Sequence, residues 1–219
     1  GDLTFGKKTV TTKPDSSNNP LLNHIRNASS GARATSRQIQ AILAEAPGTD
    51  SYPQQGLGPH LKTVAELIAA NVGIRIYFTE LGGGGIGGFD NHAIQRDNHA
   101  ALLGHLSACL TAFAADLMDR KCLDRVTLMT FSEFGRTLTE NGRRGTGHGN
   151  AAPVFLMGSK VRPGLIGKHP SLTDLDNDAL KHHTDFRRLY ATVLTNWLGL
   201  DSRPVLGPEF KPLDLFTPI

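Results

Sequence analysis

The chain has 219 residues, 39% hydrophobic and 20% charged, which is the composition of an ordinary globular domain and excludes a disordered or fibrous chain. The formal net charge is +3, but the basic residues are scattered, whereas a nucleic-acid-binding surface needs a denser basic stripe. No stretch approaches about 18 consecutive apolar residues, so the composition predicts neither nucleic-acid binding nor a membrane span.

The first part of the chain is polar at its start and predicted to be helical further on. Residues 1–20 are rich in Thr, Lys, Ser, Asn and Pro and carry no apolar signal-peptide core. We therefore expect residues 1–30 to form a polar arm or a disordered tail. Apolar spacing predicts helices over residues 32–46 and 61–69, and the turn at Asn71 and Gly73 ends the second.

Short strands and long helices alternate in the rest of the chain. Residues 74–81, 126–131 and 154–157 are short, apolar and bounded by turn residues, which predicts buried strands. Apolar spacings of three and four predict helices over residues 95–120 and 185–198. This alternation is typical of βαβ units, so we expect residues 31–219 to form one α/β domain, a three-layer αβα fold with a mostly parallel sheet. In such sheets the ligand site lies in loops beyond the strand ends, here residues 82–95 and 132–150.

The first of these loops carries two candidate metal ligands. A glycine-rich run ends in Phe89, Asp90, Asn91 and His92, and His99 follows near the start of the long helix. A carboxylate and an imidazole two residues apart in an irregular loop can bind one zinc, manganese or magnesium-like cation. The structural alternative is a glycine-rich turn in which Asp90 is solvated and His92 caps the next helix. The spacing alone leaves that alternative open.

Glu133, Arg136 and His148 are the candidates in the second loop. Glu133 is the first acidic residue beyond the predicted strand, and His148 is flanked by glycines, which let the backbone approach a ligand closely. Arg136 offers a planar fork for an anionic oxygen group. Taken singly, Glu133 can be a helix N-terminal acid, Arg136 its ion-pair partner and His148 a loop residue. Their shared position at the predicted ligand-binding edge favours a site.

Two nucleotide-binding motifs are excluded. Gly83, Gly85 and Gly88 fit the dinucleotide pattern G-x-G-x-x-G, but a run this rich in glycine fits almost any glycine pattern. The acidic residue that would bind ribose should end the next strand about 20 residues on, and that distance falls at Asp116 and Asp119, inside the predicted helix. The chain also has no Gly-Lys-Ser/Thr sequence for a P-loop.

The last predicted helix begins in a polar cluster. Thr184 or Asp185 is suited to cap its N-terminus. Arg187 either reaches the site or forms an ion pair with a surface acid, and we favour the ion pair.

Four motifs, taken in order, resemble one protein family. The sequence Gly-Gly-Phe89-Asp90-Asn91-His92, with Gln95 and His99, is similar to the family's Gly-Gly-Phe-Asp-Thr-His pattern, and residues 132–137, 145–149 and 184–187 continue the match. From about Pro59 to Phe216 the chain resembles the C-terminal half of domain-of-unknown-function family 1501. This family is exported, abundant in planctomycetes, and similar in fold to alkaline phosphatases and sulfatases.

The resemblance implies a function and a ligand set. The implied reaction is metal-dependent hydrolysis of a sulfate or phosphate ester, with a small anionic ester or a sulfated glycan as substrate. The implied cofactor is one or two divalent cations (zinc, manganese, magnesium or calcium). The implied metal ligands are Asp90, His92, Glu133 and His148, and the implied substrate-binding residues are His99 and Arg136. The family's export also implies a periplasmic or extracellular location.

Two departures from the family pattern weaken this expectation. Gly147 stands where the family usually has Asp, which removes a metal ligand or a carboxylate that orients His148. An extra glycine-rich stretch also precedes Phe89, which loosens the loop carrying Asp90.

The chain also differs from full family members, which begin with strands that carry a further ligand and the nucleophile and that have no counterpart here. Ser132 and Thr137 have no adjacent base in the sequence. We therefore expect this chain alone to bind metal weakly or not at all and to lack hydrolase activity. The competing interpretation is a degenerate, non-catalytic exported protein that binds a metal, a glycan or a partner protein.

Overall fold

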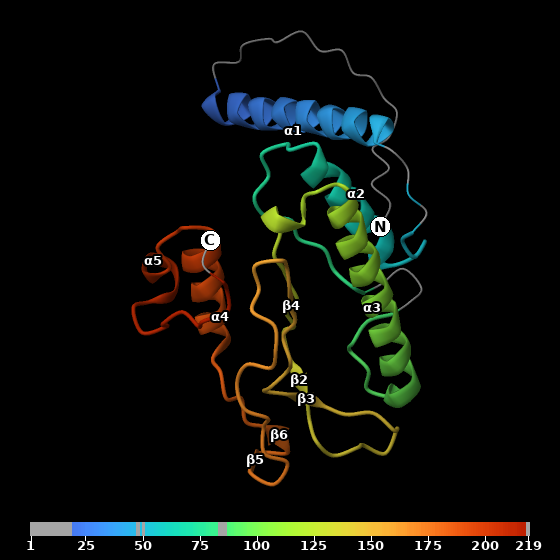
Figure 1. Ribbon diagram of the computed structural model, residues 1–219, viewed down its shortest axis with the longest axis vertical. Helices are drawn as coiled ribbons and strands as arrows, with labels where there is room; N and C mark the ends of the chain where they lie inside the picture. Colours follow the sequence, from blue (N-terminus) through green and yellow to red (C-terminus); the bar gives the residue numbers. More distant parts are fainter. Residues whose placement is uncertain (1–18, 47–48, 50, 83–86, 218–219) are drawn as a thin grey trace. The chain divides into compact units, whose positions relative to one another are not determined.

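A computed structural model describes residues 19–46, 49, 51–82 and 87–217 (Figure 1). These residues fall into two compact units. The first holds the described part of residues 1–87 together with Leu106–Phe113, and the second holds Gly88–His105 and the described residues from Ala114 onward. The long helix α3 (Gln95–Asp119) contributes to both units, as its middle belongs to the first and its ends to the second.

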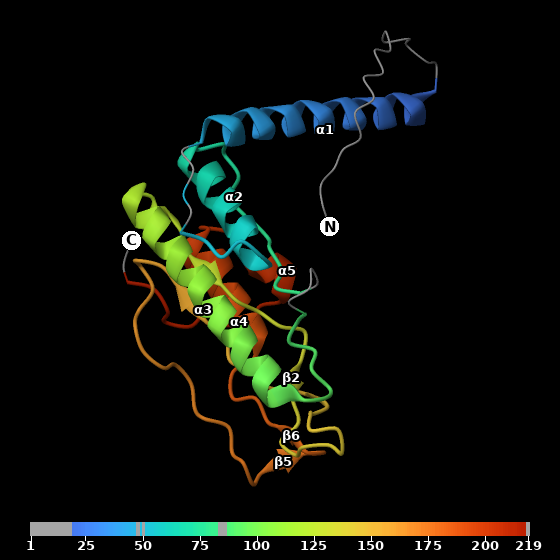
Figure 2. The ribbon, with the colours of Figure 1, turned by 90° about the vertical axis from the view of Figure 1, so that its right-hand side faces the viewer.

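The first unit is built on two helices that contact each other, α1 (Pro20–Glu45) and α2 (Leu57–Ala69), as Figure 2 shows. Asn19 caps α1, because its side chain accepts hydrogen bonds from the amides of Leu21 and Leu22, and Pro20 fits the first turn, where no amide donor is needed. Leu57, Leu61 and Ala65 of α2 are buried, whereas α1 has no buried residue.

Helix α1 begins earlier than the sequence predicts. The predicted helix started at residue 32, and residues 20–30 of the predicted polar arm form the first half of α1. Residues 1–18 of that arm lie outside the described residues. Helix α2, by contrast, ends within two residues of the predicted turn at Asn71.

The second unit contains a nested antiparallel arrangement of four short strands. Strand β1 (Leu128–Met129) pairs with β4 (Leu156–Met157), with Leu128 opposite Met157. Between them in the chain, β2 (Gly135–Arg136) pairs with β3 (His148–Gly149), with Arg136 opposite His148. Residues 128–157 therefore run out and back as one long hairpin (Figure 1).

The remaining elements of this unit contact the hairpin near its tip and pack against its base. Strands β5 (Leu175–Asp176) and β6 (Ala179–Leu180) pair antiparallel, and β6 contacts β3 near the hairpin tip. The chain ends in α4 (Phe186–Thr192), the π-helical turn η2 (Val193–Trp197) and α5 (Arg203–Leu206); the 3-10 turn η1 (Leu123–Arg125) precedes β1. One hydrophobic cluster of this unit lies at the hairpin base and contains the buried residues Leu189, Leu215 and Phe216, packed against Met129, Leu156, Val161, Trp197 and Leu213.

The predicted fold class is wrong. The structure is 43% helical, and in the described residues its strands form three two-stranded antiparallel sheets, so the mostly parallel three-layer αβα sheet is not observed. The physical reason lies in the connection between residues 131 and 154. Parallel neighbours need a crossover, usually a helix, to bring the chain back to the same end of the sheet. This connection contains no helix, so the chain turns back on itself and its strands pair antiparallel.

The predicted strand over residues 74–81 is not formed either, since the structure assigns no strand there. Ile74, Ile76 and Phe78 alternate along this extended stretch and are 43%, 70% and 70% exposed. The alternation fits a strand, but these side chains are largely exposed and not buried as the sequence predicted.

One helix of the described residues, α3, has the length and apolar composition of a membrane span. This finding rests on length and composition alone, and the core helix of a globular protein has the same properties. Phe113 and Leu117 of α3 are fully buried in the protein.

Candidate metal centre

Three side chains with metal-binding atoms converge at the hairpin of the second unit. The ligand atoms of Asp90, His92 and His148 all lie within 4.8 Å of one another. Oδ1 of Asp90 is 2.8 Å from Nε2 of His92 and 2.8 Å from Nε2 of His148. The three side chains are 58%, 40% and 49% exposed, so the cluster opens to solvent.

The first loop is shaped by backbone hydrogen bonds on both sides of the ligands. The side-chain amide of Asn91 donates to the carbonyl of Gly88, 3.2 Å away, which folds the loop around Phe89 and Asp90. After His92, the amides of Ile94 and Gln95 donate to the carbonyls of Arg143 and Arg144, at 3.0 and 2.9 Å. The start of α3 is thereby tied to the tip of the hairpin.

The second loop reaches the first because glycines remove the side chains that would separate them. A Cβ atom on Gly145 would overlap the backbone of His92, so only glycine allows the two loops to touch there. A Cβ on Gly149 would overlap the carbonyl of Arg136, and one on Gly135 would overlap the carbonyl of Ala151. Gly147 is different, because its Cβ would meet only the side chain of Thr137 at 3.4 Å, an ordinary contact.

The cluster favours the charged form of its carboxyl group. The pKa of Asp90 is lowered, mainly by the hydrogen bond from His148 and further by the positive potential of His92, His148 and Arg136, while desolvation acts in the opposite direction. A cation binds the ionised form of a carboxyl group, so the lowered pKa of Asp90 favours cation binding.

The donor set fits a divalent cation. Two imidazole nitrogens and one carboxylate oxygen match catalytic zinc sites, which use three protein ligands and leave a position open. The same set, two histidines and one carboxylate, also binds redox-active iron. Two ligands of a tetrahedral zinc ion lie about 3.3 Å apart, given bonds of about 2.0–2.1 Å, so a cation would spread the 2.8 Å contacts of Asp90 by about 0.5 Å. Exposed side chains on loops can make that adjustment.

Of the predicted site residues, the structure brings together Asp90, His92 and His148, and not Glu133. Glu133 is exposed and does not belong to the cluster. His99 lies in the second turn of α3 and packs its ring edge against Phe89, with the ring centroids 5.3 Å apart. It therefore contacts the residue that precedes Asp90.

Arg136 lies beside the cluster and faces the backbone. Its Nη1 donates to the carbonyl of Thr146 at 3.2 Å and its Nη2 to the carbonyl of Phe89. Nη2 also lies 3.4 Å from Oδ1 of Asp90. The guanidinium fork thus binds both ligand-bearing loops.

The two hydroxyl groups weighed as nucleophiles are engaged elsewhere. The hydroxyl of Ser132 donates to the carbonyl of Phe134 at 2.8 Å, closing a local turn. The hydroxyl oxygen of Thr137 accepts from the amide of Gly147 at 2.8 Å. At the last helix, Asp185 is the N-cap of α4 and forms an ion pair with Arg187, as the sequence favoured.

Sequence reasoning missed Phe134, Thr146 and Asn141. The ring of Phe134 stacks on the imidazole of His148, with centroids 3.7 Å apart and planes 5° from parallel. The hydroxyl of Thr146 donates to Gln95 at 2.7 Å, and the amide of Asn141 donates to the carbonyl of His92 at 3.1 Å. Phe134 and Thr146 lie inside the same motifs as the candidate ligands, which was the available signal, whereas Asn141 lies between those motifs.

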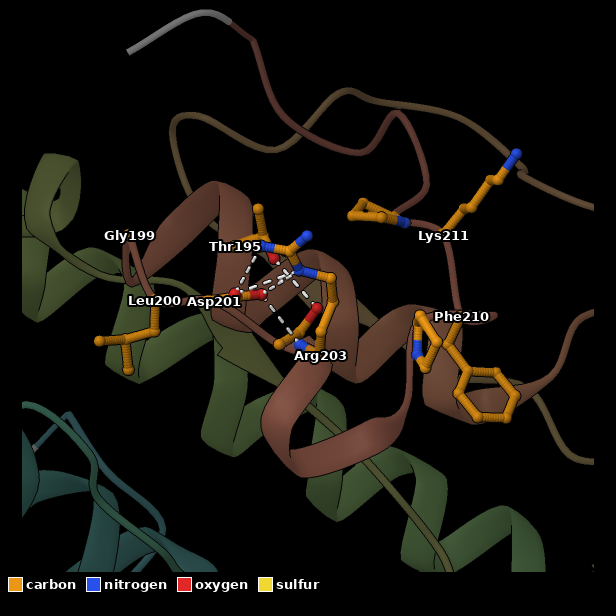
Figure 3. A pocket seen from close by; sticks show the side chains of 10 residues that line it. Thr195, Gly199, Leu200, Asp201, Arg203, Phe210 and Lys211 are labelled. Carbon is orange, nitrogen blue, oxygen red and sulfur yellow. Dashed lines mark hydrogen bonds and ion pairs between the residues drawn. The ribbon is translucent and has the colours of Figure 1, made fainter.

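A separate hollow of about 470 Å³ lies near the end of the chain (Figure 3). Its polar groups bind each other: Asp201 forms an ion pair with Arg203, and the hydroxyl of Thr195 donates to that of Ser202. The rest of the lining includes Leu200, Pro208, Phe210 and Pro212. Among the described residues that line this hollow there is no group of three candidate cation ligands, whereas Asp90, His92 and His148 form such a group.

Comparison with known proteins identifies the family of the chain but gives no reaction, substrate or cofactor. The family described as "protein of unknown function (DUF1501)" matches residues 27–211, and the chain therefore belongs to domain-of-unknown-function family 1501. No curated protein and no solved structure matches the chain. The family resemblance seen in the motifs is thus confirmed, while the reaction is not given by any relative.

Proposed function

We propose that Asp90, His92 and His148 hold one divalent cation and that the protein uses it to hydrolyse sulfate or phosphate esters. The proposal is supported by one observation: three ligand atoms from two loops far apart in the sequence lie within 4.8 Å of one another. Because two of the three ligands are imidazoles, zinc suits the site better than manganese, calcium or magnesium, which prefer oxygen ligands.

The chemistry of the proposal follows from an open coordination position. A bound divalent cation polarises an ester oxygen and lowers the pKa of a bound water, so that hydroxide forms near neutral pH. The side chains of Asp90, His92 and His148 are roughly half exposed, which gives a small anionic ester or the sulfated end of a glycan access to the cation. The electrostatic attraction between the cation and the anionic group supports this substrate class.

One observation favours a second candidate, a non-catalytic protein that binds a metal, a glycan or a partner protein. The hydroxyl proton of Ser132 is directed to the Phe134 carbonyl, and the Thr137 hydroxyl accepts from the Gly147 amide. Neither hydroxyl is prepared as a nucleophile, because activation needs a base placed to take the proton. Hydrolysis would then depend on attack by metal-activated water.

The test of the metal centre is a titration of the metal-free chain with zinc and manganese, followed by competition with a chromophoric chelator. The sequence led us to expect weak binding or none, but because the three side chains converge we now expect one equivalent to bind. Asp90→Ala and His148→Ala should abolish binding, whereas His182→Ala, an exposed histidine outside the cluster, should leave it unchanged. Failure of the wild-type chain to bind at millimolar metal would refute the proposed centre.

The test of hydrolysis is turnover of nitrophenyl phosphate and nitrophenyl sulfate by the full-length protein. Metal-dependent turnover that is lost in Asp90→Ala supports the hydrolase. Stoichiometric metal binding with no turnover of either ester supports the non-catalytic binder.

A further inference from the structure

Arg136 sits where the two ligand-bearing loops meet, and its side chain is only 16% exposed. Its guanidinium donates to the carbonyl of Phe89, the residue before Asp90, and to the carbonyl of Thr146, two residues before His148. The same group lies 3.4 Å from the carboxylate of Asp90. One side chain therefore contacts the backbone of both loops and one of the three ligands.

The position of Arg136 is fixed by strand pairing. Arg136 and His148 are directly opposite each other in the β2–β3 ladder, so their side chains lie on the same face. The ring of Phe134 stacks on His148 and lies 5.1 Å from the guanidinium carbon of Arg136, within reach of a cation–π contact. The arginine and the histidine thus share one aromatic neighbour.

We propose that Arg136 is a positioning residue that holds the Phe89–Asp90 segment against the Thr146–His148 segment, so that the carboxylate and the two imidazoles share one cation. This inference rests on the proposed metal centre, and it replaces the role of Arg136 as a contact for the anionic substrate. The guanidinium directs three of its five N–H donors at two carbonyls and a carboxylate of the protein itself.

The planar fork is the property on which this role depends. Arginine presents five N–H donors in a fixed plane and can bridge two carbonyl oxygens, whereas lysine is a compact point charge on a flexible stem. Arg136→Lys keeps the charge and removes the bridge. Loss of a group that orients metal ligands weakens metal affinity by about 10–100-fold.

The experiment compares the wild-type chain with Arg136→Lys and with the matched control Arg143→Lys, an exposed arginine on the same hairpin. Zinc affinity is measured by chelator competition, and the visible spectrum of the cobalt-loaded protein reports the ligand set. We expect Arg136→Lys to bind zinc about 10–100-fold more weakly and to change the cobalt spectrum, and Arg143→Lys to do neither.

A second measurement needs no metal. The amides of Ile94 and Gln95 donate across the two loops, so in metal-free Arg136→Lys their hydrogen exchange should accelerate at least about tenfold, while that of Thr130, bonded to Phe155 at the hairpin base, should not change. Thr146→Val removes only the hydroxyl bonded to Gln95 and should accelerate the exchange of these amides less. This variant replaces Arg136→Lys in the experiment if Arg136→Lys does not fold.

The outcomes separate this inference from the proposed metal centre. If the wild-type chain binds no metal but Arg136→Lys still releases the two loops, the metal centre is refuted and the positioning role stands. If Arg136→Lys leaves zinc affinity and exchange unchanged and instead weakens the binding of inorganic phosphate to the zinc-loaded chain, Arg136 is a substrate contact and the inference is overturned.

Discussion

The imidazole of His148 is held by its neighbours and not by burial. Phe134 stacks on one face, Asp90 accepts a hydrogen bond from its Nε2 atom, and the flanking Gly149 lets β2 approach. At the scale of single residues, the motif around His148 therefore consists of one ligand and of glycines that admit backbone contacts. The glycines differ in how strictly they are required.

Gly147 should tolerate a side chain where Gly149 does not. A Cβ at residue 147 meets only the Thr137 side chain, so Gly147→Ala should change the free energy of unfolding by less than about 0.5 kcal/mol. A Cβ at residue 149 overlaps the Arg136 carbonyl, so Gly149→Ala should cost about 1–3 kcal/mol. Urea denaturation of both variants measures the difference, and equal losses would contradict this account of the loop.

Asp185 gives a pH-dependent prediction. The hydrogen bond from Arg187 lowers the pKa of Asp185 from 3.8 to about 2. A lowered pKa stabilises the fold above the ordinary pKa, and the contribution disappears as the pH falls toward the folded value. Asp185→Asn keeps an N-cap side chain but loses the charge. We expect it to be less stable than wild type above about pH 4, with the gap closing between pH 4 and pH 2.

Denaturation curves of wild type and Asp185→Asn at pH 7, 4, 3 and 2 test this prediction. A stability gap of the same size at pH 2 as at pH 7 would show that the ion pair with Arg187 is not its cause.

The sequence predicted which side chains come together better than it predicted what surrounds them. Asp90, His92 and His148 were singled out because carboxylate and imidazole groups beside glycines are chemically distinctive, and the structure brings these three together. Glu133 was added because it would end a strand of a parallel sheet, and it lies outside the cluster once that sheet is absent. The stacking of Phe134 depends on the β2–β3 register, which no local pattern encodes.

At the scale of elements, the bounds of α3 were predictable, whereas the start of α1 and the pairing of the strands were not. The apolar spacing in residues 95–120 matched α3 to within one residue, because helical hydrogen bonds and the buried face are both local. Strands need a partner, and an apolar run does not reveal its partner or direction. The helix-free connection between β1 and β4 was the one signal that favoured antiparallel pairing.

Helix α1 should be sensitive to helix propensity but not to packing, because it has no buried residue. A Cβ on Gly31 meets nothing within 4 Å, so Gly31→Ala should stabilise the helix by about 1 kcal/mol, and Gly31→Pro should destabilise it by about 2 kcal/mol. Circular dichroism at 222 nm during thermal unfolding measures both. Neither variant should alter zinc affinity, since the ligands lie in the second unit; a change there would contradict the division into two units.

At the scale of the whole molecule, the cation should act as a stabilising ligand. A cation that binds only the folded chain at about 100 times its Kd adds about 2.7 kcal/mol to the free energy of unfolding. For a chain of this length, that corresponds to a rise in Tm of about 5–10 °C. Differential scanning fluorimetry with and without zinc tests the effect. A rise of the same size in Asp90→Ala would place the zinc elsewhere.

Asp90 and His148 are 58 positions apart, and α3 and the first half of the hairpin lie between them in the chain. Such distant contacts form late, because the chain gains nothing from them until the entropy of closing the loop has been overcome. The proposed metal centre is therefore not assembled early in folding, and we expect any metal to bind at the last stage of maturation. Since selectivity among divalent ions depends strongly on which of them is present, the ion acquired is decided by the place where folding finishes.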